Sequence, residues 1–230
     1  MAKLIHLVAA LQTLQTFYGP QRARWPTDPY RFLVWWQCGY PASEERCERG
    51  WEALTHAVGV DPDQLLAARR ATLVRALKAG GLVPELRAQR VRAIAKRTHD
   101  EFAGDLLAAL ARLPVLAARA ELRKFPGIAD PGADRVLLFA GLAPVAAVPS
   151  NCPHVVIRIE CGKVPTDYRA TYQQSRRLLE EALPATAAAR TRGYLLLQHH
   201  GQQLCKRSHP RCEKCPIAHS CTYFLSQAPG

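Results

Sequence analysis

Four cysteines lie close together near the C-terminal end of this chain, and they constrain its fold more than any other feature. Cys205, Cys212, Cys215 and Cys221 follow the spacing C-x6-C-x2-C-x5-C. Four thiolates in one short, loop-rich segment converge on a metal centre, either a [4Fe–4S] cluster or a zinc ion. Zinc usually takes two close pairs, whereas here single cysteines flank one close pair. The spacing therefore favours the cluster, although it does not exclude zinc.

Two disulfides are the alternative use of these cysteines. The first 20 residues contain no apolar stretch long enough for a signal peptide, and no segment is apolar enough to span a bilayer. We therefore expect a cytoplasmic, reducing environment, near the nucleoid if the protein is bacterial, where disulfides are rare. The remaining cysteines show no ligand spacing and are expected to be free thiols: Cys38, Cys47, Cys152 and Cys161.

The charge of the chain points to a polyanionic partner. The 230 residues include 31 Lys and Arg against 19 Asp and Glu, a formal net charge of +12. Nucleic acid is the first candidate for such an excess, and charge that merely keeps the protein soluble is the alternative.

Apolar residues recur at helical spacing along most of the chain, and no strand pair is evident, so we predict an all-α fold of two helical domains. Asp28 followed by Pro29 predicts a helix start, and Gly80-Gly81 predicts a helix end. The predicted helices cover residues 4–17, 32–36, 63–79, 86–98, 104–113, 116–124, 131–139, 168–183 and 185–197.

A tight turn between two predicted helices, 125–129, is the second strong signal. Gly127 permits a positive φ or a close backbone approach, and Asp130 with Pro131 suits the start of the following helix. Such a hairpin offers free backbone amides to a phosphate, although a simple packing corner has the same pattern. Positive charge nearby comes from Arg123, Lys124 and Arg135.

The hairpin and the cysteine spacing together resemble the endonuclease III group of helix–hairpin–helix DNA glycosylases. The hairpin is similar to the family pattern L-x-x-[LF]-P-G-[IV]-G, with Ala129 at the last position, and His200-Gly201 leads into Cys205 as in the family's H-G-x-x-x-C. The resemblance covers most of the chain. It implies a six-helix barrel at 24–143, a cluster domain at 1–23 and 144–230, and DNA bound across the cleft between them.

The resemblance also implies partners and binding residues. It implies a [4Fe–4S] cluster on the four cysteines and a monomer that binds damaged or abasic double-stranded DNA. Gln37 falls on a residue that the family inserts into the space left by an extruded base. Expected DNA contacts are Gln37, Arg123, Lys124, Gly127, Ala129, Arg135, Lys206 and Arg207, with Arg211 and Lys214 as further candidates.

Two departures from the family concern catalysis. Pro131 stands where bifunctional members have the Schiff-base Lys, and a proline within the chain has no amine nucleophile. Pro149 stands where the family has its essential Asp, and no Asp or Glu lies between Asp134 and Glu160. Strand cleavage by the usual Lys is therefore not expected.

Three functions remain open after these departures. The first is a weakened or altered glycosylase that uses Asp130, Asp134 or His154. The second is a glycosylase for bases that leave easily, and the third is a non-catalytic protein that binds lesions or DNA structures. Asp134 and His154 are the candidate catalytic residues, and each has a structural alternative. A zinc-containing DNA-binding protein is a further alternative, and identifying the bound metal would distinguish it from a cluster protein.

Overall fold

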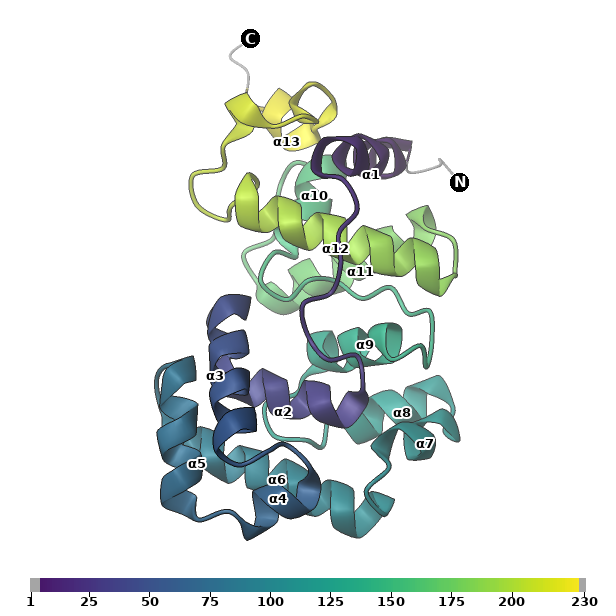
Figure 1. Cartoon of the computed structure of the whole chain (residues 1–230). Helices are drawn as coiled ribbons and strands as arrows, with labels where there is room; N and C mark the ends of the chain where they lie inside the picture. Colours follow the sequence, from purple (N-terminus) through teal and green to yellow (C-terminus); the bar gives the residue numbers. More distant parts are fainter. Residues whose placement is uncertain (1–4, 228–230) are drawn as a thin grey trace. The chain divides into compact units, whose positions relative to one another are not determined.

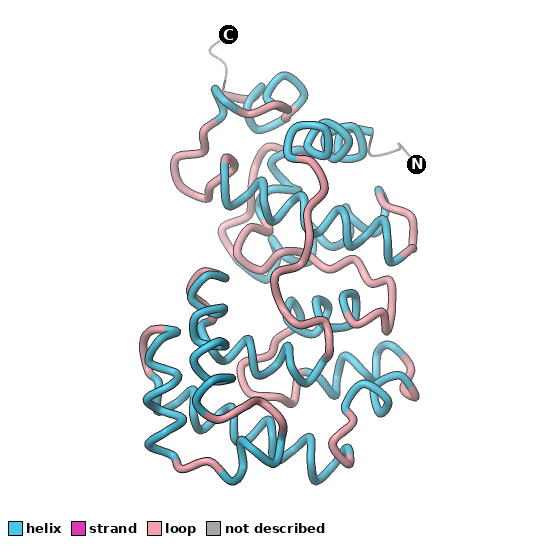
Figure 2. The backbone as a smooth tube through the Cα atoms, viewed as in Figure 1, coloured by secondary structure: helices cyan, strands magenta, loops and turns pink. Residues whose placement is uncertain are grey.

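The computed structural model describes residues 5–227, and its regular structure in this range is entirely helical (Figures 1 and 2). The prediction of an all-α fold is confirmed. Between residues 5 and 227, no helix is long and apolar enough to cross a membrane. The α-helices are α1 (Ile5–Tyr18), α2 (Pro29–Gly39), α3 (Glu44–Ala57), α4 (Pro62–Ala67), α5 (Arg70–Leu77), α6 (Pro84–Phe102), α7 (Leu106–Ala111), α8 (Val115–Leu122), α9 (Asp130–Phe139), α10 (His154–Glu160), α11 (Tyr168–Ala182), α12 (Ala187–Gln203) and α13 (Thr222–Leu225). Short 3-10 turns are η1 (Lys78–Gly80), η2 (Cys212–Lys214) and η3 (Ala218–Ser220).

The chain divides into two compact units. Unit 1 combines residues 1–22 with 143–230, and unit 2 is the continuous stretch 23–142. The N-terminal helix α1 therefore belongs with the C-terminal helices, because it packs against α10, α11 and α12.

Unit 2 is organised around α2. Asp28 caps this helix by accepting a hydrogen bond from the Arg31 amide at 2.8 Å, and Pro29 occupies its first turn, as the sequence predicts. Almost every residue of α2 is buried, including Trp35 and Trp36. The helix is apolar all round because α3, α6, α7 and α9 surround it.

Unit 1 has a second apolar core. Leu7, Leu14, Val155 and Leu197 are all fully buried there, and they come from α1, α10 and α12. Ile217, in the loop that carries the cysteines, packs into the same core. The burial of this side chain therefore attaches the loop to the helices independently of any metal.

Three helical segments differ from the prediction. The single helix predicted at 63–79 is two helices, α4 and α5, because the chain is extended at Ala68 and Arg69. Arg92 from α6 donates to the Leu66 carbonyl at 2.8 Å, which satisfies an acceptor that the break leaves free. Helices α3 and α10 are absent from the prediction. Residue 4, where the first helix was predicted to begin, lies outside the described residues.

Candidate metal centre and nucleic-acid interface

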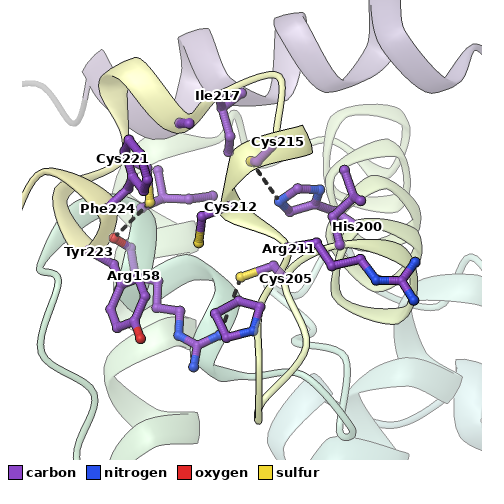
Figure 3. A pocket seen from close by; sticks show the side chains of 14 residues that line it. Arg158, His200, Cys205, Arg211, Cys212, Cys215, Ile217, Cys221, Tyr223 and Phe224 are labelled. Atoms are coloured by element: carbon purple, nitrogen blue, oxygen red, sulfur yellow. Dashed lines mark hydrogen bonds between the residues drawn. The ribbon is translucent and has the colours of Figure 1, made fainter. Parts of the chain in front are cut away.

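The four cysteines of the C-terminal loop line one hollow in unit 1 (Figure 3). Cys205 follows α12, Cys212 begins η2, Cys215 ends it, and Cys221 precedes α13. The empty space they border is about 350 Å³, part of it open to solvent. Sequence positions up to sixteen apart thus converge because the loop turns back on itself through η2 and η3.

Arg158 of α10 binds the backbone of this loop. Its Nη1 donates to the Lys206 carbonyl at 2.7 Å and its Nη2 donates to the Arg207 carbonyl at 2.9 Å. Nη1 also lies 3.6 Å from Cys205 Sγ, and the guanidinium lies 4.6 Å from the centre of the Tyr223 ring. Only 7% of Arg158 is exposed. A buried positive charge next to the thiol favours its thiolate form.

Two histidines contact the cysteine loop as neutral rings: His200 lines the cysteine hollow, and His154 lines a second hollow with Ser150 and Asn151. Burial lowers the pKa of His154 and of His200 to about 4 each. His154 Nε2 donates to the Cys205 carbonyl at 2.8 Å. The Tyr18 hydroxyl is hydrogen-bonded to His200 Nδ1 at 3.0 Å, and His200 Nε2 lies 3.8 Å from Cys215 Sγ. Both rings therefore hold the loop, one through its backbone and one through a sulfur.

Three of the four thiols hold their protons more tightly than a free cysteine does. Burial raises the pKa of Cys205, of Cys212 and of Cys215, the last to about 11. Metal binding would have to displace these protons, which makes it dependent on pH. Within residues 5–227, no three His, Cys, Asp or Glu side chains approach closely enough to hold a single metal ion.

The hairpin of unit 2 joins α8 to α9. Gly127 has φ +72°, a conformation that favours glycine, and the Ile128 amide donates to the Phe125 carbonyl at 3.2 Å. Ala129 is exposed at the N-cap position of α9. The turn predicted from the sequence is therefore present with the expected backbone.

The two charged side chains before this turn are exposed but paired. Arg123 Nε lies 3.3 Å from Asp130 Oδ1, and Lys124 Nζ lies 2.8 Å from Glu121 Oε2. Arg123 is 56% exposed and Lys124 is 63% exposed. Exposed pairs of this kind are weak, so both cations remain accessible to an anion.

Two residues expected to contact DNA are buried in this structure, so their role stays a prediction. Gln37 is 3% exposed, and its Nε2 donates to the Pro126 carbonyl at 2.7 Å. Because α2 continues to Gly39, Gln37 lies inside the helix and holds the hairpin turn. Arg135 is 4% exposed, pairs with Glu44 Oε1 at 2.8 Å, and lies 3.5 Å from the centre of the Trp25 ring.

The two catalytic candidates also have structural contacts. Asp134 is completely buried, and Arg119 Nε donates to its Oδ1 at 2.6 Å. His154 is 5% exposed and bonded to the cysteine loop. Both side chains thus make structural contacts, and a catalytic role for either stays a prediction.

Prolines occupy both positions where the family has reactive groups. Pro131 lies in the first turn of α9, and Pro149 is buried. A hollow in unit 1 lies beside the residues that follow Pro149, with Ser150, Asn151 and Tyr168 among those that line it. No carboxylate borders this hollow in the part of the chain that the structure describes.

The sequence prediction missed an exposed apolar tip before α6. Leu82 is 81% exposed and Val83 is 57% exposed. Val83 has φ +52°, a strained conformation for a β-branched residue. The sequence does contain a signal for this tip. Gly80-Gly81 indicates a helix end and Pro84 indicates the start of the next helix, so the two apolar residues between them lie in a turn.

Comparison with known proteins establishes the fold. No protein-family model and no curated protein matches this sequence. A trapped endonuclease III–DNA covalent intermediate superposes with a TM-score of 0.77 at 17% identity, over 98% of this chain and 99% of that one. A thermostable thymine-DNA glycosylase gives 0.74 at 19% identity, over 96% and 98%. An H. pylori 3-methyladenine DNA glycosylase bound to 1,N6-ethenoadenine gives 0.57 at 15%, over 87% and 94%. This chain therefore has the fold of the endonuclease III group.

Proposed function

We propose that this protein binds damaged or abasic double-stranded DNA and acts in base-excision repair through recognition more than through catalysis. The observation that carries the proposal is the surface of unit 2. There the protein has an exposed apolar tip, Leu82–Val83, and a hairpin turn with exposed cations, Arg123 and Lys124. The similar solved structures include DNA complexes of endonuclease III.

The tip has the properties of a wedge. Proteins that deform DNA insert apolar side chains between base steps, and the cost of unstacking is lowest where a base is missing or damaged. Leu82 is the most exposed large apolar side chain of the described residues. The strained backbone at Val83 and the start of α6 at Pro84 hold it outward. It takes the role that the sequence had assigned to Gln37.

Catalysis by the family's route is not supported. Pro131 and Pro149 lack reactive groups, and Asp134 and His154 are committed to structural contacts. Without a charge at the reacting sugar, base release loses several kcal/mol of transition-state stabilisation. A weak or altered monofunctional glycosylase is the second candidate, because the polar hollow beside Ser150 and Asn151 could admit a ligand.

We infer that the four cysteines hold a [4Fe–4S] cluster. Each thiolate of such a cluster binds a different iron, so the sulfurs surround a cube of metal and sulfide. The four cysteines line one hollow, and their spacing, with single cysteines flanking one close pair, favours a cluster over a zinc ion. Bound there, the cluster would cross-link the loop and hold four exposed cations outward: Lys206, Arg207, Arg211 and Lys214.

The binding test compares duplexes with and without a single abasic site by fluorescence anisotropy. The wild-type protein should prefer the abasic duplex, and Leu82→Ala should reduce that preference about ten-fold. Leu116→Ala is the matched control, because Leu116 is 75% exposed in the same unit. Equal effects of the two substitutions, or no preference in the wild type, would contradict the recognition role.

The chemical test is borohydride trapping and base release on damaged oligonucleotides. We expect no trapped complex with abasic DNA, since the lyase position is Pro131. We also expect slow or undetectable release of oxidised pyrimidines. Rapid base release without strand cleavage would favour the second candidate instead.

A further inference from the structure

Three arginines gather between two glycine turns of unit 2 without a carboxylate partner. Arg46 belongs to α3, and Arg87 and Arg90 belong to α6. Arg46 Nη1 lies 3.2 Å from the place where a Cβ on Gly81 would stand, and Arg90 Nη1 lies 3.5 Å from the corresponding place on Gly127. The guanidinium groups thus lie against the turn before the Leu82–Val83 tip and against the hairpin turn.

Arg87 joins the two outer arginines. It is 5% exposed, and it donates from Nη1 to the Cys38 carbonyl at 3.0 Å and from Nη2 to the Gly39 carbonyl at 3.1 Å. These bonds satisfy acceptors at the C-terminal end of α2. Burial lowers the pKa of Arg87 most, and the positive charges of Arg46 and Arg90 lower it further. The three charges are therefore close enough to repel one another.

No carboxylate within residues 5–227 forms an ion pair with Arg46, Arg87 or Arg90, whereas Arg31 pairs with Asp61 and Arg123 pairs with Asp130. The carbonyl oxygens that Arg87 binds carry no formal charge, so they offset only part of the repulsion. An unmatched group of guanidinium groups is suited to an anion, and guanidinium geometry matches phosphate oxygens.

We propose that Arg46, Arg87 and Arg90 form a binding site for one backbone phosphate of duplex DNA, beside the Leu82–Val83 tip. This site rests on the proposed DNA-binding function, and it names the residues that would position the protein on the duplex. Phosphate contacts set the register of a protein on a duplex. A phosphate held here would fix the distance from the backbone to the wedge, while Arg87 ties the site to the end of α2.

The test is the salt dependence of binding by the double variant Arg46→Gln/Arg90→Gln. Within residues 5–227, neither side chain forms a hydrogen bond or ion pair that the substitution would remove, whereas Arg87 is left intact because it holds α2. Losing one or two phosphate contacts should lower the slope of log K against log salt by about 1 to 2. Affinity for the abasic duplex at low salt should fall about ten-fold or more.

The control is Arg70→Gln/Arg112→Gln, which removes the same charge from two other exposed arginines of unit 2. It should change the slope and the affinity much less. Equal losses in the two double variants, or no loss in Arg46→Gln/Arg90→Gln, would overturn the phosphate site while leaving DNA binding in place. If the wild type binds no duplex at all, the proposed function itself is wrong. Should the double variant melt early, the single variant Arg46→Gln, at an exposed position, gives the same comparison against Arg70→Gln.

Discussion

The cysteine loop of unit 1 and the hairpin of unit 2 are held in place for different physical reasons. The loop has little regular structure, and it depends on what its cysteines bind and on Arg158, which holds its carbonyls. The hairpin depends on buried polar contacts between helices, such as Arg119 with Asp134 and Gln37 with Pro126. With the proposed cluster bound, one region is held by metal and the other by packing, so they should respond to different perturbations.

Substitution of one cysteine ligand should have the largest effect. Cys212→Ser should lose iron and visible absorbance and lower the stability of unit 1 by several kcal/mol, since ligand binding there contributes directly to folding. Iron analysis and thermal unfolding measure the effect. Cys161→Ser is the control, because Cys161 is exposed and does not line the hollow. Stoichiometric zinc in an anaerobic preparation would contradict the cluster.

The next largest effect is expected from removing the buried carboxylate of Asp134, which should lower the stability of unit 2. Asp134→Asn leaves the Arg119 charge without its partner and should cost about 3–5 kcal/mol in the free energy of unfolding. Asp130→Asn breaks the exposed pair with Arg123 and should cost about 0–1 kcal/mol. Urea denaturation compares them. A large loss of activity in Asp134→Asn with unchanged stability would restore Asp134 as a catalytic residue.

The hairpin glycine should have an intermediate effect. Gly127→Ala places a side chain at φ +72° and should cost about 1–2 kcal/mol. Gly141→Ala, at φ +71° with open space around it, should cost a similar amount through the backbone alone. Only Gly127→Ala should also weaken DNA binding, because its Cβ would stand 3.3 Å from Gln37 Nε2 and disturb the turn. Equal DNA affinity in both variants would show that the turn does not contact DNA.

The smallest effect is expected at the edge of the cysteine loop. Tyr18→Phe removes the hydrogen bond that orients His200 toward Cys215 and should cost about 0.5–1.5 kcal/mol. Iron content should stay unchanged, since His200 remains. Tyr168→Phe is the control on an exposed tyrosine, whose hydroxyl donates to the Ser150 carbonyl at 3.2 Å. Iron loss in Tyr18→Phe would mean that the orientation of His200 is essential for binding the cluster.

Prediction from sequence succeeded where the chemistry is local. The cap at Asp28, the glycine turn at Gly127 and the spacing of the cysteines each lie within a few residues, and the structure has each of them. It failed where the outcome depended on distant partners. The break between α4 and α5 is stabilised by Arg92 from another helix, and Arg135 is buried beneath Trp25 and paired with Glu44.

The sequence by itself determined the all-α class, the hairpin, the set of four cysteines and the two prolines that replace reactive groups. These follow from residue type and spacing, which act over one or two turns of chain. Only the tertiary structure decided which polar side chains are free. It buries Gln37, Asp134 and Arg135, exposes Leu82, and gathers three arginines that no carboxylate pairs with among residues 5–227. Exposure and charge pairing arise when helices pack, because the surroundings of each side chain come from residues far away in the sequence.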